Sequence, residues 1–253
     1  MSRSNNTEVV SPAKMFFNWN GDKGGFEYYD KEAEGEEGKK GKKIKAPFPF
    51  KFLVLDCLHT VKGFSDIDQS GFWSNEVRDL KKDEIIVKNK KGICARGLYE
   101  HVISDKNCAG AKYCQSVYVA YKDENQLVIA NIQMYGAAVS SWFSFISGKD
   151  IYKGQGRQKI YDGAISVNEF IEGKKGKTIY QIPIFTKINV REDTEEQAKL
   201  LDEILQEYLK LYFHRNNTKE NDEIIEKVVK NEDPPVEVEA GFVLDEEREP
   251  AAF

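Results

Sequence analysis

The chain has 253 residues, 40 % of them apolar, and a formal net charge of −5. This length suits one elaborated domain or two small ones, and the apolar fraction excludes a wholly disordered protein. We found no apolar run of the about 18–20 residues that a membrane-spanning helix needs. The first ten residues also lack an apolar signal-peptide core. We therefore expect a cytoplasmic protein with no membrane partner and with four reduced cysteines.

Charge is distributed unevenly along the chain. Residues 216–253 contain 12 acidic and 4 basic residues, a net charge of −8, whereas residues 1–215 contain 30 and 33, a net charge of +3. An acidic terminal segment beside a basic body is typical of nucleic-acid-binding proteins whose tail competes with the ligand. The segment could equally serve solubility alone, and charge does not decide between the two interpretations.

The first third of the chain predicts a flexible arm, a hairpin, a loop and a strand. Residues 1–13 form the arm, and aromatic residues on both sides of the Gly-rich turn 21–25 predict a hairpin. The segment 32–45 has no apolar residue between Ala33 and Ile44, so we expect a mobile loop. The apolar run 50–58 predicts a strand that is buried on both faces.

Three more hairpins and two helices are expected further along. The hairpins turn at 88–92, 122–126 and 173–176, and Pro183 marks the second strand of the last hairpin as an edge strand. The spacing of apolar residues over 136–147 favours a short helix. Asp193 and Thr194 are candidate caps of a helix over 194–213. Its apolar face follows helical spacing through Leu201, Ile204, Leu205, Tyr208, Leu209 and Tyr212.

These elements predict a mainly β fold. About seven short strands with Gly-rich turns and one late helix are typical of a small antiparallel barrel or sandwich. We expect an elaborated OB-fold-like antiparallel barrel with a C-terminal amphipathic helix. The domain would cover 14–215, and 216–253 would form an acidic disordered tail, in which 222–230 could be a short helix.

Lysine and glycine recur together at three predicted loops or turns. Flexible lysines can line a groove with ammonium groups that contact phosphates regardless of base sequence. The alternative is that they only keep hairpin tips soluble. The candidate DNA-binding lysines are Lys39, Lys40, Lys42, Lys43, Lys88, Lys90, Lys91, Lys174, Lys175 and Lys177.

Aromatic residues supply the second part of a single-strand-binding surface, because bases stack on exposed rings in any sequence. Most rings in a β domain belong to its core, so we selected rings in polar or alternating segments. The candidate DNA-binding rings are Trp19, Phe72, Trp73, Tyr118, Tyr121 and Tyr135.

Signals for an enzyme or a metal site are weak. The segment 173–178 ends like a phosphate-binding loop, but Ile171 occupies the position of the first required glycine. A metal-dependent nuclease would have to use Asp66, Asp68 and Asp56. The spacings of the candidate zinc ligands do not match common structural sites; these ligands are Cys57, His59, His101, Cys108 and Cys114. We expect no cofactor, no metal and no enzymatic activity.

The β-rich body with basic loops, surplus rings, a late helix and an acidic tail resembles replicative single-stranded DNA-binding proteins, especially the phage-encoded type. Segments within 51–146 also look like DNA-binding proteins of tailed phages. This resemblance implies sequence-independent binding and protection of single-stranded DNA in replication, recombination and repair. The setting would be a bacterial cytoplasm or a phage-infected host.

Tails of bacterial members of this family end Asp-Ile-Pro-Phe, whereas this chain ends Glu-Pro-Ala-Ala-Phe. The resemblance implies that Phe253 docks into replication and recombination proteins, and that the acidic residues compete for the DNA groove. The acids concerned are Asp245, Glu246 and Glu247. The alternatives are a nuclease that acts on single strands and a β-rich structural or interaction protein of a phage. The sequence leaves the oligomeric state open.

Overall fold

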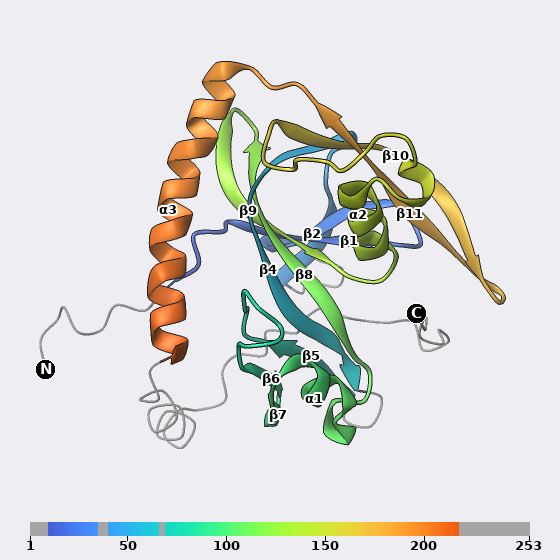
Figure 1. Ribbon diagram of the computed structural model, residues 1–253, viewed down its shortest axis with the longest axis vertical. Coiled ribbons are helices and arrows are strands. Elements are labelled where there is room, and N and C mark those ends of the chain that lie inside the picture. The colour runs from blue at the N-terminus through green and yellow to red at the C-terminus, as the bar shows by residue number, and fades with distance from the viewer. Residues whose placement is uncertain (1–9, 35–39, 66–68, 218–253) are drawn as a thin grey trace, which may run out of the picture.

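The computed structural model describes residues 10–34, 40–65 and 69–217, which form a mainly β fold with a C-terminal helix (Figure 1). The strands are β1 (Met15–Asn20), β2 (Gly25–Glu34), β3 (Lys40–Lys45), β4 (Phe50–Ser65), β5 (Ser70–Ser74), β6 (Ile85–Asn89), β7 (Gly92–Gly97), β8 (Ala111–Asp123), β9 (Gln126–Met134), β10 (Ala164–Lys175) and β11 (Thr178–Ile188). The helices are α1 (Tyr99–Ser104), α2 (Ala137–Ser147) and α3 (Glu192–Asn217), with short 3-10 turns η3 (Lys106–Cys108) and η4 (Asp150–Tyr152). None of the described helices is both long and apolar enough to span a membrane.

The long strand β4 is the branch point of the sheet. The strand order is β3-β2-β1-β9-β8-β4-β5-β6-β7, in which β1 and β9 are parallel. One edge of β4 pairs with β8 over most of its length. Its other edge pairs first with β10, over residues 50–53, and then with β5, over residues 62–65. Figure 1 shows β5, β6, β7 and α1 grouped at the lower end of β4 and β8, while the β10–β11 hairpin projects to the right.

Three apolar clusters hold these parts together. The main core lies among β1, β2, β4, β8, β9, β10, β11 and α2, with Phe17, Phe50 and Trp142 almost fully buried. A second cluster lies between α3 and the sheet and includes Leu205 and Leu209. A third cluster joins β5, β6, β7 and α1 to the end of β4. Helix α3 thus covers one face of the sheet, because its apolar side chains recur every third or fourth residue and point to that face.

The predicted hairpins, the helix over 136–147 and the edge strand that contains Pro183 are confirmed. The predicted loop over 32–45 is partly wrong, because β3 pairs with β2 there although it has few apolar residues. The late helix starts at Glu192, so Asp193 and Thr194 lie in its first turn. The backbone amides of Thr194 and Glu195 donate to the carbonyl of Arg191, which begins the helix. Before β1, Ala13 packs against the second apolar cluster, which lies between α3 and the sheet.

Gly63 allows β4 and β8 to approach at the end of the sheet. A Cβ at this position would lie 2.2 Å from the carbonyl oxygen of Gly110. We expect Gly63→Ala to lower the free energy of unfolding by about 1–3 kcal/mol, because backbone must move to admit the methyl group. Urea unfolding measures this loss. Gly71→Ala is the matched control, since its Cβ would make only an ordinary 3.8 Å contact; an equal loss in both variants would contradict the steric explanation.

Candidate nucleic-acid interface

Four side chains are aligned in a row across the neighbouring strands β8, β4, β5 and β6. Lys112 of β8 is opposite Lys62 of β4, Lys62 is opposite Trp73 of β5, and Trp73 is opposite Lys88 of β6. Directly opposite residues of antiparallel strands point to the same face, with Cβ atoms about 4.5–5.5 Å apart. We call Lys112, Lys62, Trp73 and Lys88 the Trp73 row.

The Trp73 row combines an exposed ring with positive charge. The Trp73 side chain is 43 % exposed, Lys112 is exposed, and Lys62 and Lys88 are half-buried. Burial lowers the pKa of Lys62, while Cys114 and Glu76 act in the opposite direction. Burial also lowers the pKa of Lys112, and the charge of Lys175 lowers it further. The charge of Lys175, at the β10–β11 turn, thus acts on Lys112 of the row.

A buried polar cluster lies next to the row, beneath α3. The hydroxyl groups of Ser116 and Tyr118 donate to the carboxylate of Glu76, with a distance of 2.8 Å for Tyr118. The amide of Glu76 donates to the hydroxyl of Tyr212 on α3, also at 2.8 Å. Burial raises the pKa of Glu76, while Ser116, Tyr118 and Lys62 lower it. Glu76 thus supplies a partly buried countercharge for Lys62 and ties the row to α3.

Four of the six candidate rings are buried. Trp19 is 7 % exposed and donates from Nε1 to the carbonyl of Gln181 at 2.8 Å. Phe72, Tyr118 and Tyr121 are 3 %, 2 % and 8 % exposed. The prediction that these four rings present a face to solvent is wrong, because the core clusters and α3 cover them. Tyr135 is half-buried, and burial raises its pKa to about 12.

The candidate lysines lie at three separate places. Lys90 and Lys91 are exposed at the β6–β7 turn, close to Lys88, and Lys174, Lys175 and Lys177 are exposed at the β10–β11 turn. Lys42 and Lys43 are exposed on β3. The position of Lys40 in β3 is described, and Lys39 lies outside the described residues. Since β3 and β7 are at opposite ends of the strand order, the register links only the β6–β7 group to the Trp73 row. The β10–β11 group is linked to the row through the charge of Lys175, which acts on Lys112.

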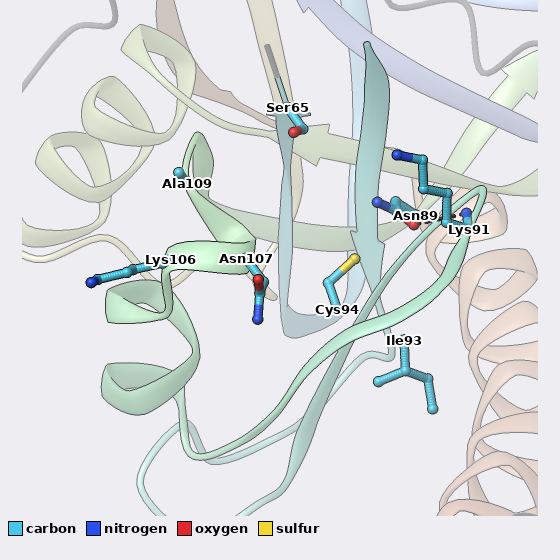
Figure 2. A pocket seen from close by; sticks show the side chains of 8 residues that line it. All are labelled: Ser65, Asn89, Lys91, Ile93, Cys94, Lys106, Asn107 and Ala109. Atoms are coloured by element: carbon cyan, nitrogen blue, oxygen red, sulfur yellow. Dashed lines mark hydrogen bonds between the residues drawn. The ribbon is translucent and has the colours of Figure 1, made fainter. Parts of the chain in front are cut away.

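A cavity of about 370 Å³ lies beside the row, between the β6–β7 hairpin and η3 (Figure 2). It adjoins the row because Ile93, in its lining, is opposite Lys88. Figure 2 shows Asn89 and Lys91 at the hairpin turn, with Asn107 on the other side of the space and the sulfur of Cys94 between them. The lining consists of Ser65, Asn89, Lys91, Ile93, Cys94, Lys106, Asn107 and Ala109.

Several residues with suitable chemistry were missed in the sequence. Lys62 and Lys112 stand in strands whose partners cannot be read from local composition. On the opposite face of β8, Tyr113 contacts Tyr99 of α1 and Phe143 of α2, with ring centroids 6.1 and 6.0 Å apart. The hydroxyl of Tyr113 lies 2.7 Å from Nδ1 of His59. Helical periodicity could have indicated Phe143, because it lies on the exposed side of α2.

The structure gives the nuclease and zinc alternatives little support. Asp56 pairs with Arg78 at 2.8 Å and accepts from Gln206 at 3.1 Å, so its carboxylate is already engaged. Asp66 and Asp68 lie outside the described residues. Burial raises the pKa of both Cys57 and Cys114 to about 12, which keeps these thiols protonated. Within the part of the chain that the structure describes, histidine, cysteine and acidic residues form no group of three suited to a metal ion.

The tail residues Asp245, Glu246, Glu247 and Phe253 also lie outside the described residues. Comparison of the chain with protein-family models, with curated proteins and with solved structures gave no match.

Proposed function

We propose that the protein binds single-stranded DNA without sequence preference and protects it during replication or recombination. The observation that carries this proposal is the exposed ring of Trp73 between Lys62 and Lys88 on neighbouring strands. A base can stack on the ring while flanking ammonium groups contact phosphates of the same strand. Neither contact distinguishes one base from another, because every base has a π-face and every nucleotide has a phosphate.

The proposed fold behind this activity is an elaborated OB-type barrel. Strands β1, β4, β8, β9 and β10 enclose the main core. The strand order itself describes an open path, but the amide of Gln181 in β11 donates to the carbonyl of Gly21 in the β1–β2 turn at 2.6 Å. This contact connects the β10–β11 hairpin with the β1–β2 hairpin and supports a partly open barrel. OB-type barrels commonly bind oligonucleotides.

The function is proposed to be non-enzymatic, with the acidic segment 216–253 as an intramolecular competitor for the basic surface and a recruiter of replication proteins. Like charges on the tail and on DNA would make the two occupy the same lysines in turn. Deletion of residues 240–253 is expected to tighten binding of oligo-dT at low salt. Fluorescence anisotropy of a labelled oligonucleotide measures the change. Unchanged or weaker binding would show that this segment does not compete.

Intrinsic fluorescence offers a direct test of the proposed function. The chain has three tryptophans, of which Trp19 and Trp142 are buried at 7 % and 0 % exposure. Oligo-dT is therefore expected to quench mainly Trp73, and added salt should reverse the quenching. Trp73→Phe should bind the oligonucleotide with little fluorescence change. Absence of both quenching and a gel shift at low salt would refute the proposal, and magnesium-dependent loss of the oligonucleotide would favour the nuclease.

A further inference from the structure

The outer face of α3 carries large apolar side chains that no element of the described residues covers. Leu200, Ile204 and Leu211 are 61 %, 52 % and 58 % exposed. At 3.6 residues per turn these three side chains fall within an arc of about 40°. The buried residues Leu205 and Leu209 point to the sheet on the other side of the helix. Figure 1 shows α3 along one edge of the molecule. We call Leu200, Ile204 and Leu211 the outer stripe of α3, and their exposed fractions show that it faces solvent.

The spacing of the outer stripe is that of a coiled-coil seam. Steps of four and seven residues follow the heptad rule, in which apolar positions recur every 3.5 residues on average. Glu203 and Lys210 are exposed, lie seven residues apart and flank the same side of the stripe. In coiled coils, charged residues at such flanking positions set partner choice and orientation. These charges make α3 complementary to itself.

We propose that the outer stripe of α3 docks antiparallel against α3 of a second copy of this chain. In this arrangement a two-fold axis passes between Ile204 and Glu207, and Leu200 of each copy packs against Leu211 of the other. Glu203 then faces Lys210 of the second copy, and the two-fold axis generates the same ion pair again. The two outer layers of the contact are thereby apolar with oppositely charged residues at the rim, while Glu207 lies opposite Ile204 of the other copy in the two central layers.

The charges disfavour the other simple arrangements. An antiparallel register that aligns Leu200 with Ile204 of the second copy would place Glu203 against itself. A parallel pair would place Glu207 directly against Glu207 of the second copy, whereas the antiparallel register places it opposite Ile204. Like charges directly opposite each other are destabilising. The self-complementary register therefore identifies a second copy, rather than an unrelated helix, as the occupant.

The contact area of one helix is small, so the association should depend on protein concentration. Interfaces below the standard size usually belong to weak, transient complexes. Sedimentation equilibrium of the full chain at about 5–200 µM is expected to show a shift from the 28.9 kDa monomer towards twice that mass. A second copy would also place two Trp73 rows on one particle, but the proposal does not depend on DNA binding.

Charge reversal provides the decisive test. Leu211→Glu should keep the protein monomeric throughout this concentration range. Glu203→Lys and Lys210→Glu should each weaken the dimer about tenfold or more, and the double variant should restore it, because the pair is re-formed with opposite polarity. Ile151→Glu is the matched control, since this side chain is 50 % exposed but lies outside α3.

The proposal is overturned if the wild-type chain remains at 28.9 kDa, or if the dimer survives Leu211→Glu. Failure of the double variant to restore a dimer that both single variants weaken would also overturn the proposed register. Circular dichroism melts of each variant separate loss of association from loss of folding. Oligo-dT binding by the monomeric variant would further separate this inference from the proposed function.

Discussion

Trp73→Ala is expected to weaken oligo-dT binding by about 5- to 150-fold, because stacking of a base on an aromatic ring contributes about 1–3 kcal/mol. The ring is exposed on β5 and lies between lysines on both neighbouring strands. Its removal leaves those lysines in place, so the salt dependence of binding should change little. Anisotropy titrations at one low salt concentration measure the affinity, and a salt series measures the dependence.

Phe16→Ala is the matched control for this prediction. The Phe16 side chain is 45 % exposed but belongs to β1, which β9 separates from β8 in the strand order. The Phe16→Ala variant should therefore bind oligo-dT as the wild-type chain does. Equal losses in the two variants would mean that rings contribute through general hydrophobicity or folding, and no loss in Trp73→Ala would remove stacking at the row from the proposed mechanism.

The contrast between Trp73 and Tyr118 shows what local sequence can reveal about such a site. Both rings lie in strands and both were expected to face solvent. Trp73 stays exposed because it points away from the third apolar cluster, to which Phe72 on the opposite face contributes. Tyr118 is buried because the distant Glu76 and the late helix α3 cover it. Local composition describes the strand but does not reveal which distant element packs on it.

The fold was more predictable than the site. The helical spacing in α3 and the turn residues of the hairpins are local signals, and they indicated the correct elements. The pairing of β3 with β2 depends mainly on backbone hydrogen bonds, which leave little trace in its lysine-rich sequence. The alignment of Lys62 with Lys112 depends on register between strands about 50 residues apart, and a shift by one residue would reverse the faces.

The combined replacement of Lys88, Lys112 and Lys175 by alanine is expected to reduce the salt dependence of oligo-dT binding substantially. Each phosphate contact to a single strand contributes about 0.7 to the slope of log affinity against log salt, so three contacts contribute about 2. The same relation predicts an affinity loss of about 100-fold at 0.1 M salt. We leave Lys62 unchanged in this variant, because it opposes the buried charge of Glu76 and its loss would disturb folding.

A second triple variant, in which alanine replaces Lys42, Lys43 and Lys122, tests whether the effect belongs to the row or to net charge. These lysines are exposed, and they lie on β3 and at the β8–β9 end of β8, away from the Trp73 row. Both variants lose three positive charges, so a general electrostatic effect would weaken binding equally in both. If the phosphates contact the lysines beside Trp73 specifically, only the first variant should show a large change in the slope of log affinity against log salt. Equal slopes would mean that binding depends on net charge, and the Trp73 row would then lose its special role.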